Sequence, residues 1–288
     1  MAMALLCMAL LFSLVKMAAP SMSVYGLSFF NGLIWDPSSD VYTARPFILG
    51  TLVTSLIALI ISAPLAVLIA IYIIELAPAR LRKFLRTLIE VMAGVPSIII
   101  GLWGIFIVVP LMRDSVAPFC NQYLSFIPFL AGTSFGVGVF TAAIILSIMI
   151  IPIIASISCE IFSTIPRTLK EAALSLGASR LEMIQIAMVK PSTAGIIGAT
   201  ILGLARAMGE TMAVTMVIGN SPKMFSSLWE PGATLSSIIA NDYAEASPGL
   251  HIASLGYLAI ILMVISFVMN RVALTIRKRM IKKQGQVV

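Results

Sequence analysis

Long apolar runs alternate with short polar connections along the chain, and this pattern predicts six helices that cross a membrane. A helix needs about 20 apolar residues to cross the hydrocarbon core. Backbone inside lipid must satisfy its own hydrogen bonds, so each run is interpreted as a helix. The predicted spans cover 3–21, 46–75, 87–111, 135–158, 194–219 and 252–276.

The first of these runs has two interpretations. It carries Lys16, and no basic residue precedes it, which argues against a cleaved signal peptide. A transmembrane helix whose lysine extends toward the interface explains the same residues. We therefore predict a retained span and keep the signal peptide as the alternative.

Composition agrees with an integral membrane protein. The chain has 288 residues, of which 60% are hydrophobic and 11% charged. Its mean hydropathy of +1.06 lies well above that of soluble domains. The cysteines, Cys7, Cys120 and Cys159, are far apart, and His251 is the single histidine. The sequence therefore supports no disulfide framework, no metal cluster and no histidine-based catalysis.

Positive charges fall mainly on one set of connections between the predicted spans. Fourteen Lys and Arg residues lie on the first set and three on the second. Connections rich in Lys and Arg stay in the cytoplasm, so the first set and both chain termini are predicted to be cytoplasmic. The net charge of +7 thus reflects topology better than nucleic-acid binding. The first set holds Arg80, Arg82, Lys83, Arg86, Arg167, Lys170, Arg180, Lys190, Arg271, Arg277, Lys278, Arg279, Lys282 and Lys283, and the second Arg45, Arg113 and Lys223.

Residues 163–191 predict a helix–turn–helix between the fourth and fifth spans. Pro166 suits the first turn of a helix, and Gly177 suits the left-handed residue that follows a helix end. Ser179 and Glu182 have the spacing of a capping box, which begins a second helix. This connection is therefore predicted to be a defined structure.

The first helix of this connection carries Glu171, followed by Ala172 and Ala173. The two alanines let another protein approach the backbone closely, while the carboxylate can pair with a basic residue of that protein. An ordinary amphipathic surface hairpin explains the same spacing. The residues alone leave both interpretations open.

Two charged residues, Arg206 and Glu210, interrupt the run that predicts the fifth span. A charge at the bilayer centre costs about 2.5–3.5 kcal/mol on insertion scales. On a helical projection both residues fall on a face of small residues, which predicts that they point into the helix bundle. That face holds Gly195, Ala199, Gly203, Arg206, Glu210 and Ala213, and the residues predicted to point away are Ile201, Leu204, Met208 and Met212.

The pair has a structural and a functional interpretation. An interior ion pair that locks two helices is possible, but an i,i+4 pair stabilises a helix by only about 0.2–0.5 kcal/mol. That gain does not offset two buried charges. The functional interpretation is that Arg206 offers its planar donor fork to an oxyanion in a translocation path.

Several stretches carry a resemblance to a known family. EAALSLG, at 171–177, resembles the EAA motif of ABC importer permeases, which is a cytoplasmic coupling helix that docks on the ATPase subunit. The stretches 51–75, 89–106 and 205–221, the last containing RAMGETMAV, resemble the phosphate-specific branch. ETMAV, together with ANDYAEA at 240–246, is closer to the C-type permease of that branch than to the A-type.

The resemblance implies an all-α polytopic fold with six transmembrane helices, the MetI-like fold of type I ABC importers. Residues 1–45 would form the first helix and a periplasmic connection. Residues 46–276 would form the permease domain, with a coupling helix at about 164–177. Residues 277–288 would be a basic cytoplasmic tail.

The chain departs from the family pattern at one point. The family motif usually closes on a Leu-Pro pair, where this chain has Val189 and Lys190, with Pro191 one place later. This leaves open how the chain leaves the second helix of the hairpin. The docking residues are unaffected.

The resemblance implies a permease subunit that forms half of the path for inorganic phosphate in an ATP-driven importer. Its expected partners are an A-type permease subunit, an ATPase dimer, an external phosphate-binding protein and membrane lipid, in the cytoplasmic membrane of a prokaryote. The chain has no G-x-x-x-x-G-K-[ST] loop, so ATP and Mg²⁺ belong to the ATPase partner. The chain itself is expected to be no enzyme, to bind no cofactor and to contact no nucleic acid.

The expected site has two parts. Glu210 is predicted to orient Arg206 in an empty path and to accept a hydrogen bond from protonated phosphate, which sulfate does not offer. Glu90 has a cytoplasmic interfacial position as its alternative, and 234–247 is predicted to form an outer-face helix near the gate or the binding protein. The predicted pathway residues are Arg206, Glu210, Thr211, Ser97 and Glu90, and the predicted coupling residues are Glu171, Ala172, Ala173 and Gly177.

Other classes of function remain as alternatives. A permease for another oxyanion, such as molybdate or sulfate, is the nearest of them, and only the RAMGETMAV stretch argues against it. A channel with an arginine filter would need no docking hairpin. An intramembrane enzyme would need converging acid–base groups, whereas Glu90, Glu160 and Glu210 fall in three predicted spans. A scaffold or sensor without transport is the last alternative.

Overall fold

The computed structural model describes residues 2–123 and 126–284, and its regular structure is helical apart from two isolated β-bridges. Within these residues, six helical segments are long and apolar enough to cross a membrane. The predicted number of spans is therefore confirmed. The six segments are Met8–Phe30, Arg45–Leu76, Ser97–Tyr123, Val139–Ser163, Arg180–Gly209 and Leu250–Lys278.

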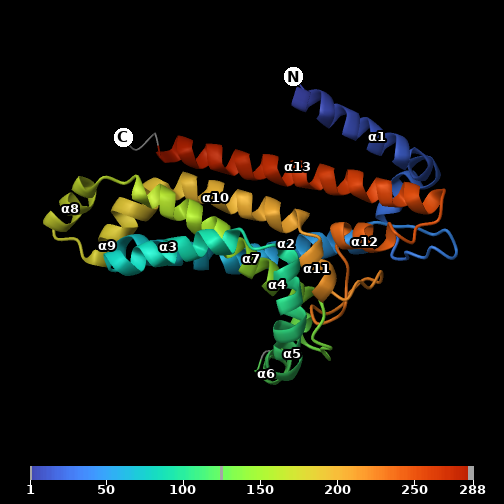
Figure 1. Cartoon of the computed structure of the whole chain (residues 1–288), viewed down its shortest axis with the longest axis horizontal. Helices are drawn as coiled ribbons and strands as arrows, with labels where there is room; N and C mark the ends of the chain where they lie inside the picture. The colour runs from blue at the N-terminus through green and yellow to red at the C-terminus, as the bar shows by residue number, and fades with distance from the viewer. Residues whose placement is uncertain (1, 124–125, 285–288) are drawn as a thin grey trace. The chain divides into compact units, whose positions relative to one another are not determined.

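The α-helices are labelled in Figure 1. Shorter 3-10 or π-helical turns join several of them into longer runs. The α-helices are α1 (Ala2–Tyr25), α2 (Arg45–Ile71), α3 (Ala79–Ala93), α4 (Ser97–Trp103), α5 (Val109–Leu111), α6 (Ala117–Tyr123), α7 (Val139–Ser163), α8 (Arg167–Ser175), α9 (Arg180–Met183), α10 (Lys190–Gly209), α11 (Met212–Val217), α12 (Leu235–Asp242) and α13 (Leu250–Gln284).

The structure divides into two compact units, and some of the long helices contribute residues to both. The first unit contains the chain up to Ile57, Ser97–Leu146 and Met208–Phe267, and the second contains Ala58–Pro96, Ser147–Ala207 and the chain from Val268. α13 continues past residue 276, where the sequence predicts the start of a tail. The division into a first helix, a permease domain and a tail stays a prediction.

Aromatic side chains fill the core of the first unit. Phe29 stacks on Tyr257 with ring centroids 4.5 Å apart, and Trp35 meets Tyr42 edge to face at 4.9 Å. These rings pack with Phe47 in one buried cluster. In the same unit α4 and α11 lie side by side, because glycine leaves room for close approach (Figure 1). A Cβ at Gly101 would lie 2.6 Å from the sulfur of Met216.

The core of the second unit joins the end of the second span to the α8–α9 segment. Ile73 packs with Cys159 and Phe162 of α7 and with Met183 of α9. Burial of these apolar side chains supplies the main driving force for holding the segment in place. The connection between spans four and five is thus part of the folded unit.

The third span begins later than the sequence pattern predicts. The pattern predicts a span over 87–111, but the candidate span begins at Ser97 and continues to Tyr123. The chain leaves the helical state between Ala93 and Ser97, because Pro96 has no N–H and disfavours helical geometry in the residue before it. The predicted start at residue 87 is wrong.

The fifth span begins earlier and ends earlier than predicted. α9, a π-helical turn over Ile184–Val189 and α10 form one run, so the second hairpin helix continues directly into the span. Pro191 removes one N–H and crowds a carbonyl one turn before it, and the wider π-helical turn lies at that place. The predicted span over 194–219 is wrong at its end, because α10 ends at Gly209.

Candidate functional site

The hairpin formed by α8 and α9 has the local structure that its sequence predicts. Pro166 directly precedes α8 in an extended conformation, one position before the predicted first turn, and Ser179 caps the start of α9. The amide of Glu182 donates to Ser179 Oγ at 3.4 Å, and the amide of Ser179 donates to Glu182 Oε2 at 2.8 Å. The predicted capping box is confirmed, and Figure 1 shows α8 and α9 beside each other.

Gly177 makes the turn between the two helices possible. Its φ is +88°, and a Cβ at this position would meet nothing within 4 Å. The requirement for glycine is therefore conformational, since side chains disfavour positive φ. The amide of Ala178 donates to the carbonyl of Ala173 at 3.2 Å and closes the helix end. The predicted left-handed glycine is confirmed.

The hairpin is fastened to the end of the second span through Glu75. Lys170 Nζ of α8 lies 2.7 Å from Glu75 Oε2, and each side chain is only 16% exposed. Arg180 Nη2 of α9 donates to the backbone carbonyl of Glu75 at 3.1 Å. The sequence interpretation did not include Glu75. A carboxylate at the end of an apolar run is the signal that could have drawn attention to it.

The outward surface of the hairpin combines a carboxylate with exposed leucines. Glu171 and Ala172 are exposed, whereas Ala173 packs against the core of its own unit. Leu176 is 89% exposed and Leu181 is 79% exposed. Exposed apolar side chains grouped on a short surface element are typical of interaction sites. Of the two alanines predicted to meet a partner, Ala172 is the one that remains accessible.

The second part of the site is a break in the helix directly after α10. Glu210 and Thr211 lie outside regular helix, and α11 begins at Met212. The hydroxyl of Ser236 donates to the carbonyl of Glu210 at 2.8 Å. Glu210 is 8% exposed, and its Oε1 accepts from the amide of Ala213 at 3.5 Å. The carboxylate thus meets the start of α11, where a helix favours negative charge.

The start of α12 holds this break in place from within the first unit. Thr234 and Ser237 form a capping box, and the amide of Leu235 donates to Thr51 Oγ1 of α2 at 2.9 Å. Gly50 permits this close approach, because a Cβ there would lie 2.1 Å from the carbonyl oxygen of Ala233. The predicted helix within 234–247 is confirmed as α12, and its role near a gate stays a prediction.

Arg206 lies on the last turn of α10 in the second unit, and its side chain is exposed. Most small residues of the predicted face are buried: Ala199 is 1% exposed, and a Cβ at Gly203 would lie 2.7 Å from Ile154 of α7. The prediction that Arg206 points into the bundle of its own chain is wrong. Gly195 also lies against α7, because a Cβ there would lie 2.8 Å from Ile161.

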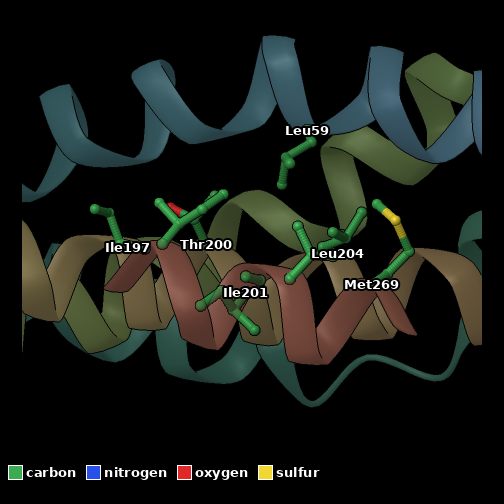
Figure 2. A pocket seen from close by; sticks show the side chains of 9 residues that line it. Leu59, Ile197, Thr200, Ile201, Leu204 and Met269 are labelled. Carbon is green, nitrogen blue, oxygen red and sulfur yellow. The ribbon is translucent and has the colours of Figure 1, made fainter. Parts of the chain in front are cut away.

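The apolar residues predicted to point away from the bundle also differ from that prediction. Ile201, Leu204 and Met208 are buried, whereas Met212 is exposed as predicted. Figure 2 shows Ile201 and Leu204 beside Leu59 around a cavity of about 230 Å³. α10 therefore contacts its neighbours on more than one face, which a single helical projection does not anticipate.

This cavity has the wrong chemistry for an oxyanion. Its lining residues are apolar except for Thr200, whose hydroxyl donates to the carbonyl of Ile196 at 2.8 Å. No cationic side chain is among the described lining residues. An anion there would lose its hydration without gaining donors. The cavity is therefore unsuited to binding an oxyanion.

Of the remaining predicted pathway residues, Glu90 and Ser97 lie apart from the broken span in the sequence, whereas Thr211 lies in the break itself. Glu90 is on α3, before the third span, and its Oε1 lies 3.5 Å from Arg86 Nε. Ser97 is the first residue of α4 and is half-buried, and Thr211 precedes α11. The position of Glu90 favours the interfacial interpretation. In the part of the chain that the structure describes, no three His, Cys, Asp or Glu side chains group as metal ligands.

The chain is similar to a known family of transport proteins along most of its length. Residues 62–282 match the family model described as "Binding-protein-dependent transport system inner membrane component". The chain is 41% identical over 270 residues to the phosphate transport system permease protein PstC of Xylella fastidiosa strain 9a5c, covering 92% of this chain and 83% of the relative. It is 42% identical to PstC of Haemophilus influenzae, covering 96% and 88%. A probable PstC of Methanocaldococcus jannaschii is 38% identical, covering 91% and 85%.

Solved structures share the fold at low sequence identity. A bacterial ABC transporter involved in the import of the acidic polysaccharide alginate matches with a TM-score of 0.59 at 17% identity, covering 96% of this chain and 95% of that one. The MetNI methionine ABC transporter in an inward-facing conformation matches with a TM-score of 0.54 at 18% identity, covering 80% and 91%. The predicted MetI-like fold is confirmed.

Proposed function

Because the chain belongs to the binding-protein-dependent transport system inner membrane components, we propose that it is the permease subunit forming half of an ATP-driven path for inorganic phosphate. The relatives named PstC, which align with more than nine-tenths of the chain, support phosphate as the substrate. The chain is a transport component, and ATP hydrolysis belongs to a separate subunit.

The observation that carries the proposal is the exposed guanidinium of Arg206 on a membrane-spanning helix. A charge that faced lipid there would be costly, so the exposed face must meet water or a partner subunit. A planar donor fork suits a tetrahedral oxyanion. Arg206 is therefore the residue that phosphate meets in the path.

Glu210 and Thr211 follow Arg206 where the helix is broken. A break in a membrane helix is tolerated where the backbone is buried in protein or lines a cavity. The buried carboxylate of Glu210 orients Arg206 in the empty path and accepts a hydrogen bond from a protonated phosphate oxygen. Thr211 and Ser97 add hydroxyl groups to this path, and Glu90 lies at its cytoplasmic margin.

The α8–α9 hairpin is the docking element for the ATPase subunits, which bind ATP and Mg²⁺. Glu171 pairs with a basic residue of the ATPase, and the exposed Leu176 and Leu181 supply apolar contact. Ala172 allows close approach, and Gly177 sets the angle between the helices. Movement of the docked ATPases then carries α9 and α10 together as one rigid element.

The assembled importer contains an A-type permease subunit as the other half of the path, an ATPase dimer and an external phosphate-binding protein. The distribution of basic residues supports a cytoplasmic position for both chain termini in the inner membrane of a prokaryote. α12 then lies on the outer side, near the gate or the binding protein.

ATP-driven uptake by the purified complex in proteoliposomes tests this function. Wild type should accumulate phosphate only with ATP and the binding protein. Arg206→Ala should assemble and lose uptake by about 100-fold or more, because the anion loses a charged, planar donor in the path. Glu171→Ala should lose the ATPase subunit or its coupling. Normal uptake by Arg206→Ala would remove the pathway role.

A second experiment separates phosphate from the rival oxyanions. Uptake of phosphate, sulfate and molybdate is measured for wild type and for Glu210→Gln. The carboxylate accepts a hydrogen bond that only a protonated anion donates, so the substitution should lower phosphate uptake and narrow its preference over sulfate. Unchanged uptake of both anions would eliminate this role for Glu210. Preferred uptake of molybdate by wild type would reassign the substrate.

A further inference from the structure

Glu75 receives contacts from both arms of the α8–α9 hairpin. Its carboxylate lies 2.7 Å from Lys170 Nζ, which comes from α8. Its backbone carbonyl accepts from Arg180 at the start of α9 at 3.1 Å. The contacts join residues 95 and 105 positions apart in the sequence. One residue at the end of the second span thus fastens the whole hairpin.

The chain geometry at Glu75 explains the contact from Arg180. A π-helical turn over Tyr72–Leu76 ends the second span, and the backbone becomes extended at Ala77. Carbonyl groups in the last turn of a helix have no partner in the helix itself. A guanidinium that donates to such a carbonyl satisfies it and complements the negative end of the helix dipole.

The pair between Glu75 and Lys170 differs from an ordinary surface ion pair. Exposed pairs contribute little to stability and can be lost with little effect. Here both side chains are 16% exposed, so either charge left alone would be poorly solvated. A displacement of α8 must therefore either move the end of the second span or separate two largely buried charges.

We propose that Glu75 is a positioning residue that transmits movement of the α8–α9 hairpin to the second span. This inference rests on the proposed function, in which the hairpin receives that movement from the ATPase. The chain itself already links α9 to α10, so the fifth span moves with the hairpin without further contacts. The second span has no such covalent link. It meets the hairpin through the apolar cluster that contains Ile73 and Met183, and Glu75 adds the charged contact that ties it to both arms.

The test compares variants in the complete reconstituted complex. Two quantities are measured: phosphate moved per ATP hydrolysed, and the stimulation of ATP hydrolysis by the loaded binding protein. Glu75→Gln should lower both by about tenfold, within the usual range of coupling between sites. Lys170→Arg, which keeps the charge, should stay within about twofold of wild type.

A neutral double variant distinguishes a loss of coupling from a folding defect. Glu75→Gln with Lys170→Gln leaves no unpaired charge, so it should assemble and melt near wild type yet keep the coupling loss. Arg113→Gln is the control, because it removes an ion pair with the neighbouring Asp114, and the two side chains are 53% and 58% exposed. It should leave both quantities unchanged.

Several results would overturn the proposal. A double variant with wild-type coupling would show that the pair serves stability alone. So would a failure of every charge-removing variant to assemble while Lys170→Arg assembles. A failure of the proposed function looks different: wild type would hydrolyse ATP without moving phosphate, while stimulation by the binding protein would still report on Glu75.

Discussion

The α8–α9 hairpin and the α12 corner, which consists of α12, Gly50, Thr51 and the break at Glu210, are held together in different ways. The turn of the hairpin is set by bonds between residues a few positions apart, such as Ser179 with Glu182. The corner depends on bonds over long separations, 26 residues for Ser236 with Glu210 and 184 residues for Leu235 with Thr51. The hairpin exposes its leucines, whereas the corner buries its polar groups.

Because of this difference, the two regions should respond differently to substitutions and to movement of a partner. Local bonds let the hairpin keep its shape while a partner moves it, because few of them depend on the rest of the chain. The corner has buried polar groups that must keep their partners, since an unsatisfied buried group costs about 1–3 kcal/mol. The corner should therefore be sensitive to single substitutions, and the turn of the hairpin less so.

The largest loss of stability is expected from Gly50→Ala in the α12 corner. The added methyl group would lie 2.1 Å from the backbone oxygen of Ala233, which cannot move without displacing α12. Overpacking of this kind should cost about 3 kcal/mol and lower the melting temperature of the purified protein. Gly209→Ala is the matched control, because a Cβ there meets nothing within 4 Å. Equal melting of the two variants would contradict the close approach.

A smaller loss is expected from Ser236→Ala. The substitution leaves the carbonyl of Glu210 without its hydroxyl donor, at a cost of about 2 kcal/mol. Hydrogen exchange should rise at the first amides of α11. Ser55→Ala is the control, because that hydroxyl donates only to carbonyls of its own helix, at 2.6 and 3.2 Å. If both variants exchange alike, Ser236 does not hold the break.

The same contrast explains how much the sequence could predict. The number of spans, the capping box and Gly177 follow from patterns within a few residues, and all three are confirmed. The break after Gly209 interrupts an apolar run that reads as continuous helix. It depends on Ser236, which is remote in the sequence and has no pattern that links it to Glu210.

The orientation of α10 was unpredictable for a related reason. A helical projection assigns one buried face, but α10 has neighbours on several sides, so Ile201 and Leu204 are buried too. Arg206 could be proposed from the sequence because a charge in an apolar run is conspicuous, and its role in the path stays a prediction. Glu75 was missed because its partners, Lys170 and Arg180, are recognisable only once the hairpin has folded against it.

The hairpin should show only a modest response to the loss of a cap. Ser179→Ala removes the side-chain acceptor of the Glu182 amide and should cost about 1 kcal/mol, confined to α8 and α9. Hydrogen exchange should rise in the hairpin and stay unchanged in α11. Thr164→Ala is a nearby control, since its exposed hydroxyl donates to the carbonyl of Ile161 and caps no helix start. A change spreading to α11 would break the distinction between the regions.

The smallest loss of stability is expected on protonation of Glu230, which belongs to the first unit and lies outside the predicted spans. This residue tests whether polar bonds near the α12 corner depend on charge. The amide and hydroxyl of Ser226 donate to its carboxylate at 2.7 and 2.8 Å and hold the pKa of Glu230 below its usual 4.5. A lowered pKa contributes stability above the unfolded value, and this is lost as pH falls through the folded value. Exchange of the Ser226 amide should therefore, once corrected for intrinsic rates, accelerate as pH falls below about 4.5. Glu230→Gln should remove this pH dependence, and persistence of the dependence in that variant would assign it to another group.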